Sequence, residues 1–174
     1  GRQVIIFTHN IMFHYMMENE ARRAGIPCHT EWMSSLGGTK FGIIDDSGKP
    51  NHTKKAKQRI GELNQAKAKL YKDGYDPAVQ EFRDPLTGIS TLMRETWERN
   101  VEEILFNGTI QRFRPEVMTQ SLKHACYDPA DDYPAIFEGM KRCSHHSGHD
   151  RAADLPLELP DKAEIDSDLQ ALID

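Results

Sequence analysis

The sequence predicts an α/β chain, in which a short sheet segment precedes a helical hairpin and a mainly helical C-terminal region. Residues 4–7 are four consecutive apolar residues, a pattern typical of a strand that is buried on both faces. Strand and helix patterns alternate over the first 45 residues, as in a βαβ unit. From residue 53 onward, the spacing of apolar residues becomes helical. We therefore divide the chain into an α/β part at 1–50, a helical hairpin at 51–110 and a helical region at 111–174.

The α/β part is expected to begin with a strand over residues 2–8. Apolar residues at helical spacing then predict a helix over 11–24, which Gly25 and Pro27 end. A second strand is expected at 28–33 and a short third strand at 40–44, on the two sides of a glycine turn.

The hairpin is expected to consist of two long helices joined by a short turn. The first runs over 53–72 and the second over 78–106, where Pro85 and Gly88 are expected to kink it. The apolar seam of the first helix consists of Ala56, Ile60, Leu63, Ala66 and Leu70. That of the second consists of Phe82, Ile89, Leu92, Met93, Thr96, Trp97, Val101, Ile104 and Leu105.

The C-terminal region is expected to contain a helix over 129–142, which begins after Asp128. Small and polar residues then predict a loop, and a last short helix is expected over 161–173.

Composition points to a soluble cytoplasmic protein. The chain is 38% hydrophobic and 28% charged, and its apolar runs are far shorter than the roughly 18 residues of a membrane-spanning helix. The N-terminus has no signal-peptide pattern. Three widely spaced cysteines are typical of a reducing compartment rather than of a disulfide framework.

Charge is distributed unevenly along the chain. Residues 53–72 carry seven basic side chains and one acid, whereas residues 150–174 carry eight acids and two basic side chains. A basic helix can contact the phosphates of DNA or RNA, although a solvated helix face explains the same pattern. The candidate nucleic-acid contacts are Lys54, Lys55, Lys57, Arg59, Arg112 and Arg114.

The segment "CSHHSGHD" at 143–150 is a second candidate site. Its thiol and imidazole groups suit zinc, but no pair of cysteines with metal-site spacing completes a ligand set, so we assign no metal. A metal-dependent hydrolase, a general-base or phosphate-contacting role and an exposed polar loop remain alternatives. The candidate residues are His145, His146, His149 and Asp150.

The segment "GIIDDSGKP" does not form a phosphate-binding loop. Five residues separate Gly42 from Gly48, and Lys49 precedes Pro50 instead of Ser or Thr. A P-loop needs four intervening residues and a hydroxyl that reaches Mg²⁺.

The opening segment "RQVIIFTHN", followed by "IMFHYMMENEARRAG", resembles the last strand and the switch-histidine region of ABC-type ATPases. The resemblance is strongest to the SMC- and RecN-like branch of large bacterial ATPases labelled AAA. It implies that His9 contacts the γ-phosphate of ATP, with Thr8 and Asn10 beside it at the nucleotide; Asn10 stands where Asp is common. The segments "RETWERNVEEILFNGTIQRFRPEV" and "GMKRCSHHSGHD" also resemble the C-terminal regions of such ATPases in phage-defence and restriction-like systems.

This resemblance implies a C-terminal part of an ATPase, because the chain lacks the Walker A, signature and Walker B motifs. ATP and Mg²⁺ are then cofactors of the complete protein, and we expect neither tight binding nor hydrolysis by this chain alone. The expected partners are the remainder of the ATPase, a second copy of the complete ATPase, DNA or RNA, and an effector subunit, with no membrane. A nucleic-acid-binding or protein-binding module without nucleotide chemistry is the alternative.

Overall fold

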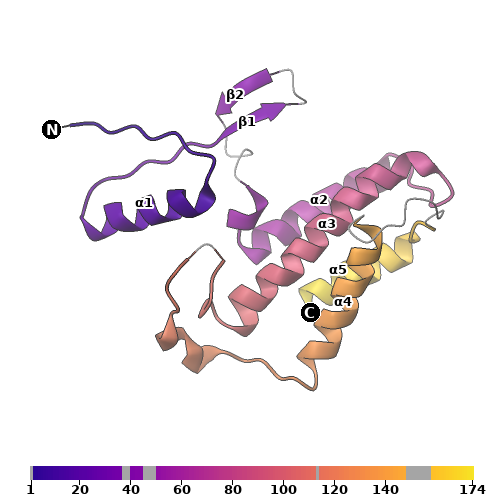
Figure 1. The fold of residues 1–174 in the computed structure, drawn as a ribbon. Coiled ribbons are helices and arrows are strands. Elements are labelled where there is room, and N and C mark those ends of the chain that lie inside the picture. The colour runs from indigo at the N-terminus through magenta and orange to yellow at the C-terminus, as the bar shows by residue number, and fades with distance from the viewer. Residues whose placement is uncertain (1, 37–39, 45–49, 113, 148–157) are drawn as a thin grey trace.

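The computed structural model describes residues 2–36, 40–44, 50–112, 114–147 and 158–174. The chain is mainly helical, and the strands in these ranges form only a two-stranded antiparallel hairpin (Figure 1). The predicted α/β fold class, with an ABC-ATPase-like sheet segment in the chain, is therefore wrong. Among the described residues, the first predicted strand pairs with no other segment, and no two strands pair in parallel.

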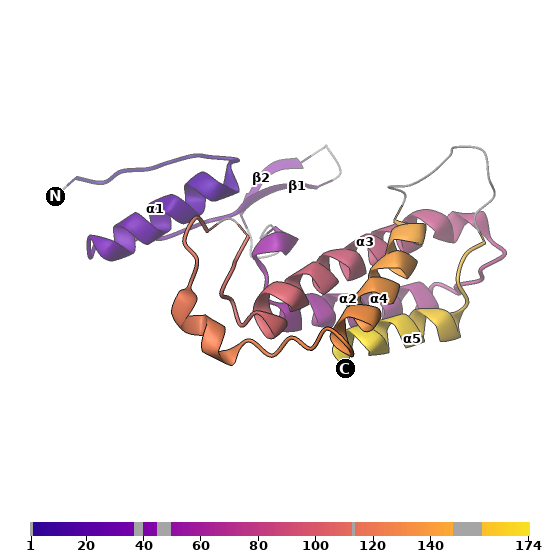
Figure 2. The ribbon, with the colours of Figure 1, turned by 60° about the horizontal axis from the view of Figure 1, so that its bottom comes forward.

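The segment 2–8 is not a strand in the structure, although its sequence predicts one. It runs alongside helix α1 (Ile11–Arg23), away from the bundle that the helices after residue 55 form (Figures 1 and 2). The apolar pattern is typical of a strand, but a strand also needs a neighbour for its hydrogen bonds, and the described residues supply none. The whole segment is exposed, including its four large apolar side chains, Val4, Ile5, Ile6 and Phe7.

Helix α1 begins and ends as the sequence predicts. Asn10 caps its N-terminus, and Gly25 follows its C-terminus with a φ of +64°, the left-handed conformation that favours glycine. The Ile26 N–H closes the end by donating to the Ala21 carbonyl at 2.8 Å. The helix buries none of its residues fully, and the side chains of Met12, Phe13, Met16 and Met17 are exposed.

The small hairpin consists of β1 (Met33–Leu36) and β2 (Lys40–Ile44), with Met33 opposite Ile44. The predicted strand at 28–33 is thus displaced toward the C-terminus, whereas the prediction at 40–44 is confirmed.

Helices α2 (Ala56–Lys72) and α3 (Arg83–Asn100) form the predicted helical hairpin. Two short 3₁₀ helices, η2 (Asn51–Thr53) and η3 (Gln80–Phe82), precede them. Pro85 does not kink α3, because it lies in the first turn, where its missing N–H leaves no helical hydrogen bond unmade.

Helix α3 continues into a π-helical turn, η4 (Val101–Leu105). The wider turn changes which side chains face the core, because each π turn contains an extra residue. Ile104, which was predicted as part of the apolar seam, is therefore 55% exposed. Trp97, which belongs to the same predicted seam but lies in α3, is buried.

Helices α4 (Asp132–His146) and α5 (Lys162–Ile173) complete the bundle, after the 3₁₀ helix η5 (Thr119–His124). Asp161 and Glu164 form a capping box at the start of α5, each accepting the backbone N–H of the other. The hydrophobic core lies among α2, α3, α4 and α5. It contains Leu63, Leu70, Tyr75, Leu86, Ile89, Met93, Trp97, Cys143, Leu159, Ile165, Leu169 and Leu172.

Helices α3 and α4 pack closely against each other at Gly139. A Cβ at this position would lie 2.6 Å from the Trp97 ring, so only glycine fits without a shift. Within the described residues, none of the helices combines the length and the apolar character needed to cross a membrane.

Candidate functional site

His9 lies at the junction between the extended N-terminal segment and helix α1. Its side chain is exposed and forms no hydrogen bond or ion pair within the described part of the chain. Its two neighbours are held by local hydrogen bonds. The Thr8 hydroxyl oxygen accepts from the Asn10 N–H at 3.0 Å, and the Asn10 side-chain oxygen accepts from the Phe13 N–H at 3.1 Å.

An exposed apolar surface surrounds this junction. The side chains before His9 have exposed fractions of 78%, 69%, 46% and 78% for Val4, Ile5, Ile6 and Phe7. The side chains after it are between 38% and 50% exposed: Met12, Phe13, Met16 and Met17. So many exposed apolar side chains in one short segment are typical of a segment that another protein covers. We call these eight residues the N-terminal apolar surface.

An ion pair links the N-terminal unit, which we define as residues 2–36 and 40–44, to the loop that precedes η5. Arg23 at the end of α1 forms an ion pair with Glu116 at 2.9 Å. Burial raises the pKa of Tyr15, and the positive charges of Arg99 and Arg114 oppose this rise, so α1 lies near the end of α3. Among the described residues, α1 contributes none to the hydrophobic core of the bundle.

Three of the six predicted nucleic-acid contacts are engaged within the protein. Lys54 forms an ion pair with Glu62 at 2.6 Å. Arg59 is buried, with 3% of its surface exposed, and one of its terminal nitrogens donates to the Glu95 carbonyl at 2.6 Å. Arg112 pairs with two carboxylates of the α3 end, Glu98 at 2.6 Å and Glu102 at 3.2 Å.

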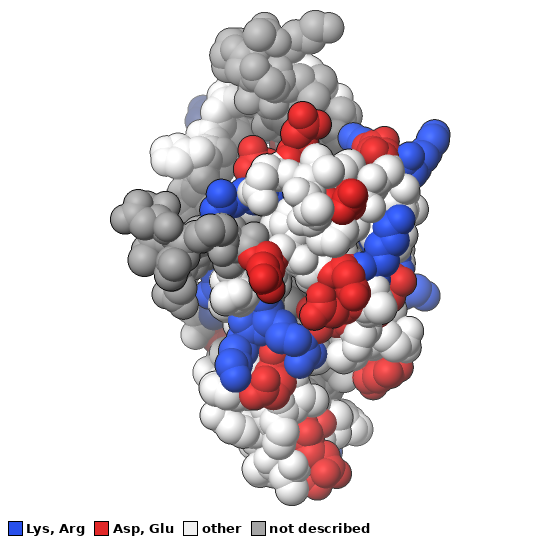
Figure 3. Space-filling view, turned by 90° about the vertical axis from the view of Figure 1, so that its right-hand side faces the viewer, with Lys and Arg blue, Asp and Glu red and all other residues white. Residues whose placement is uncertain are grey.

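The other three predicted contacts, Lys55, Lys57 and Arg114, are exposed. They do not extend into a basic face over the whole hairpin. At the end of the bundle where α2 turns into α3, Lys and Arg side chains are interspersed with Asp and Glu (Figure 3). The positive charge of α2 is also reduced by α5, where Asp166 pairs with Lys67 at 2.7 Å.

The sequence analysis missed an ion-pair cluster at the end of α3. Arg99 pairs with Glu102 at 3.2 Å and with Glu103 at 3.0 Å, and Glu102 also binds Arg112. Glu103 in addition accepts from the Ala56 N–H at 3.2 Å, which places a carboxylate at the N-terminus of α2. The i,i+3 and i,i+4 spacing of "RNVEE" at 99–103 was a signal for this cluster.

Arg59 lies beside the cluster without joining it. Burial lowers the pKa of its guanidinium, and the nearby charge of Arg99 lowers it further. Among the described residues, its buried Nε has no hydrogen-bond partner and Arg59 forms no ion pair. The ion pairs and hydrogen bonds of this cluster thus connect α2, the end of α3 and the loop that follows.

The histidine-rich segment is only partly described. His145 and His146 end α4 with their rings 5.0 Å apart, while His149 and Asp150 lie outside the described residues. The described side chains include no group of three that could hold a metal ion.

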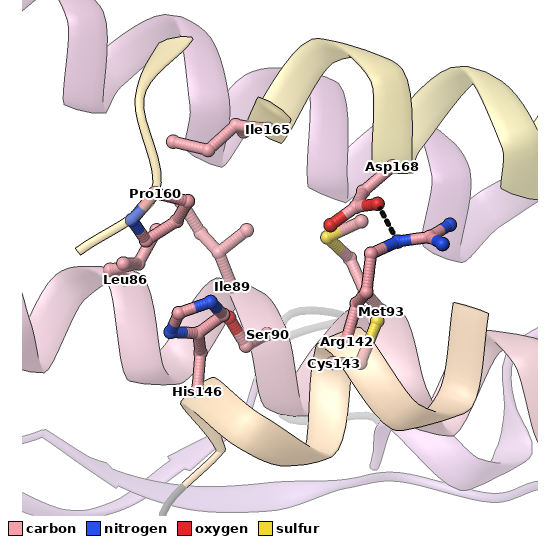
Figure 4. Close-up of a pocket in the computed structure, with 10 residues that line it drawn as sticks. All are labelled: Leu86, Ile89, Ser90, Met93, Arg142, Cys143, His146, Pro160, Ile165 and Asp168. Atoms are coloured by element: carbon pink, nitrogen blue, oxygen red, sulfur yellow. Dashed lines mark hydrogen bonds and ion pairs between the residues drawn. The ribbon is translucent and has the colours of Figure 1, made fainter. Parts of the chain in front are cut away.

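His146 also lines a small pocket between α3, α4 and α5 (Figure 4). Arg142 and Asp168 form an ion pair on the side of the pocket opposite His146. Burial raises the pKa of the Cys143 thiol, which also lines the pocket, to about 12. This thiol is therefore protonated at neutral pH and unsuited to nucleophilic chemistry.

Comparison of the chain with family models, with curated proteins and with solved structures gives no match. The functional argument therefore rests on the residues and their geometry.

Proposed function

We propose that this chain is the C-terminal part of an ABC-type ATPase that acts on or with nucleic acid in bacterial anti-phage defence. In this proposal His9 contacts the γ-phosphate of ATP. The observation that supports it is the extended, exposed apolar run at 4–7, which leads directly to an exposed histidine.

Exposure of these four apolar side chains to water is unfavourable in free energy unless a partner covers them. Full burial of one large apolar side chain contributes about 1.5–3 kcal/mol, so four of them leave on the order of 6 kcal/mol available for binding. Because consecutive residues of an extended segment point in opposite directions, all four are buried only when the segment is covered on both faces. In this proposal the remainder of the ATPase lies against both faces of the segment and so meets this requirement.

The remainder would also supply the groups that bind ATP and Mg²⁺. A histidine can donate a hydrogen bond to a phosphate oxygen, but the β-phosphate and Mg²⁺ need the backbone cradle, the lysine and the acidic side chains of Walker motifs. In the proposal the ATPase works as a homodimer, and an effector subunit is a further candidate partner.

The nucleic-acid part of the proposal rests on three residues. Lys55, Lys57 and Arg114 are exposed cations for which the structure gives no carboxylate partner within the described chain, and such side chains can bind phosphates. Binding through so few contacts should have a shallow salt dependence, with a slope of log K against log salt of about −2 to −3. A slope near zero would contradict phosphate contacts at this surface.

The central test uses the complete ATPase and the variant His9→Ala. Hydrolysis should be abolished while ATP binding is largely retained, because the histidine contacts only the terminal phosphate. His29→Ala is a matched control, since His29 is an exposed histidine of the same N-terminal unit and its ring lies 2.6 Å from Glu31. Turnover that is unchanged in His9→Ala would refute the assignment.

The first measurement should be the intact mass of the native protein, detected with an antibody against this chain. A mass far above 19.9 kDa is expected, because the remainder of the ATPase is proposed to be part of the same polypeptide. A mass near 19.9 kDa would require a separate subunit to complete the nucleotide site. If no such subunit copurifies, the N-terminal apolar surface would favour the alternative of a protein-binding module without nucleotide chemistry.

A further inference from the structure

We infer that the exposed side of helix α2 binds the phosphate backbone of double-stranded DNA. This inference rests on the nucleic-acid part of the proposed function and extends it in two ways. It names duplex DNA as the partner, and it adds Lys69 and Lys72 to the contacts that Lys55 and Lys57 make. We call the exposed residues from Lys55 to Lys72 the α2 face.

The α2 face carries four lysines and no acidic residue. Lys55 and Lys57 lie at the start of the helix, and Lys69 and Lys72 lie in its last turn. The structure gives none of these four side chains a carboxylate partner among the described residues. All four are therefore available to phosphates.

Two acids that contact α2 are already paired with other cations. Glu62, the single acid in the sequence of α2, forms an ion pair with Lys54 at 2.6 Å. Asp166 of α5 forms an ion pair with Lys67 at 2.7 Å. The next acid along the chain, Asp73, follows at the C-cap of the helix. The α2 face thus has a positive charge that complements a row of phosphates.

The middle of the α2 face is low, so a nucleic-acid strand can lie along it. Gly61 and Ala68 are about two helical turns apart and share one side of the helix, and a Cβ added at Gly61 would meet nothing within 4 Å. The helical period places the longer side chains of Asn64 and Gln65 on opposite sides of this strip. From Lys57 to the end of the helix the face is about 22 Å long, over which a DNA strand carries about six phosphates.

The composition of the α2 face favours duplex DNA over other nucleic acids. Proteins that hold single strands stack the bases on aromatic side chains, and none of the exposed residues of α2 is aromatic. The Gln58 side-chain oxygen accepts from the Lys55 N–H at 3.1 Å, which leaves its NH₂ group free to donate to an acceptor of the DNA. Amides beside a bound strand can reach the wide major groove of B-DNA, whereas the deep and narrow major groove of A-form RNA excludes them.

The first test measures binding of this chain to a labelled DNA duplex of mixed sequence, by fluorescence anisotropy at several salt concentrations. Two contacts beyond Lys55, Lys57 and Arg114 should steepen the slope of log K against log salt to about −4 to −5. In the double variant Lys69→Gln, Lys72→Gln the slope should return to about −2 to −3, and Kd at about 0.1 M salt should rise more than tenfold. An unchanged slope and Kd in this variant would overturn the inference and leave the contacts of the proposed function intact.

The double variant Lys123→Gln, Lys141→Gln is the matched control, because it removes two exposed positive charges outside α2. Its slope and Kd should equal those of the unaltered chain. An equal loss of binding in this control would show that affinity follows net charge alone, and would overturn the inference.

Gly61→Leu tests the low middle of the α2 face without changing its charge. The added side chain should hold the strand away from the helix and raise Kd at least about fivefold, since loss of one phosphate contact has this effect near 0.1 M salt. Gly88→Leu should not, although Gly88 is also an exposed helical glycine whose added Cβ would meet nothing within 4 Å. Both variants should keep the thermal midpoint of the parent. Equal Kd values in the two variants would overturn the inference.

Competition with unlabelled nucleic acids tests the partner itself. The DNA duplex should compete at least about tenfold better than its separate strands or an RNA duplex of the same sequence. Equal or stronger competition by either of these would overturn the inference. Absence of all binding would overturn it together with the nucleic-acid part of the proposed function, whereas the ATPase part is decided separately by His9→Ala.

Discussion

Gly139→Ala gives a direct test of how closely α3 and α4 pack. The added Cβ would lie 2.6 Å from Cε2 and Cζ2 of Trp97, whose ring is only 6% exposed and therefore cannot swing into solvent. Overpacking of this kind costs about 1–3 kcal/mol. Replacing a helical glycine by alanine gains about 0.5–1 kcal/mol at an unobstructed site. The expected result is a net loss of about 1 kcal/mol in the free energy of unfolding.

Gly61→Ala is the matched control, because Gly61 is also in the middle of a helix and its added Cβ would meet nothing within 4 Å. This variant should be more stable than the parent by about 0.5–1 kcal/mol. Urea unfolding followed by circular dichroism measures both variants without relying on the fluorescence of Trp97. In a Trp97→Phe background the cost of Gly139→Ala should shrink, since the obstructing ring atoms are gone. Equal stabilisation by the two alanines would refute the close packing of α3 against α4.

Three further predictions concern buried or paired side chains. Cys143 should react with a thiol reagent near pH 8 only after unfolding, because it is 3% exposed and its pKa is about 12, whereas the other two cysteines are exposed and should react in the native protein. A hydrogen bond from Lys67 lowers the pKa of Asp166 in the folded protein. The pair therefore stabilises the fold above the unfolded-state pKa of about 3.9. This stabilisation is lost as the pH falls through the lower folded-state pKa. Urea titrations should therefore show Asp166→Asn to be less stable by under about 1 kcal/mol near neutral pH and equal to the parent well below pH 3. Arg59→Met should leave the free energy of unfolding unchanged or raise it, because it removes a buried charge that has no ion pair with the described residues. A decrease of more than about 1 kcal/mol in urea titrations would contradict this.

The helical hairpin was the most predictable part of the fold. In α2 the predicted seam is confirmed, since Leu63 and Leu70 are buried and Ile60 packs beside them. Helical spacing is informative here because the helices bury one face against each other, so the pattern and the contacts have the same period. The last helix, α5, is confirmed to within a residue because Asp161 and Glu164 form a capping box that the sequence displays directly.

That residues 2–8 form no strand with the described residues could not be predicted from local pattern. Residues 4–7 have the composition of a buried strand, but whether they form one depends on a partner strand that no local sequence encodes. The π-helical turn also escaped prediction, because the apolar stripe near Ile104 continues with ordinary helical spacing. The ion pair between Arg112 and Glu98 joins residues of two different segments, so its formation follows from the tertiary fold and not from spacing alone.

The apolar run at 4–7 also has a consequence for handling the protein. An uncharged, β-prone segment with unpaired backbone groups can pair with its counterpart in another molecule, which leads to aggregation as concentration rises. As the isolated chain is concentrated, its light scattering should accordingly rise and the amount of soluble protein should fall. Ile5→Lys, which places a gatekeeping charge inside the run, should suppress this behaviour without touching the helical core. Binding studies on the isolated chain are therefore best made at high dilution, where self-association through this segment is not mistaken for binding to a partner.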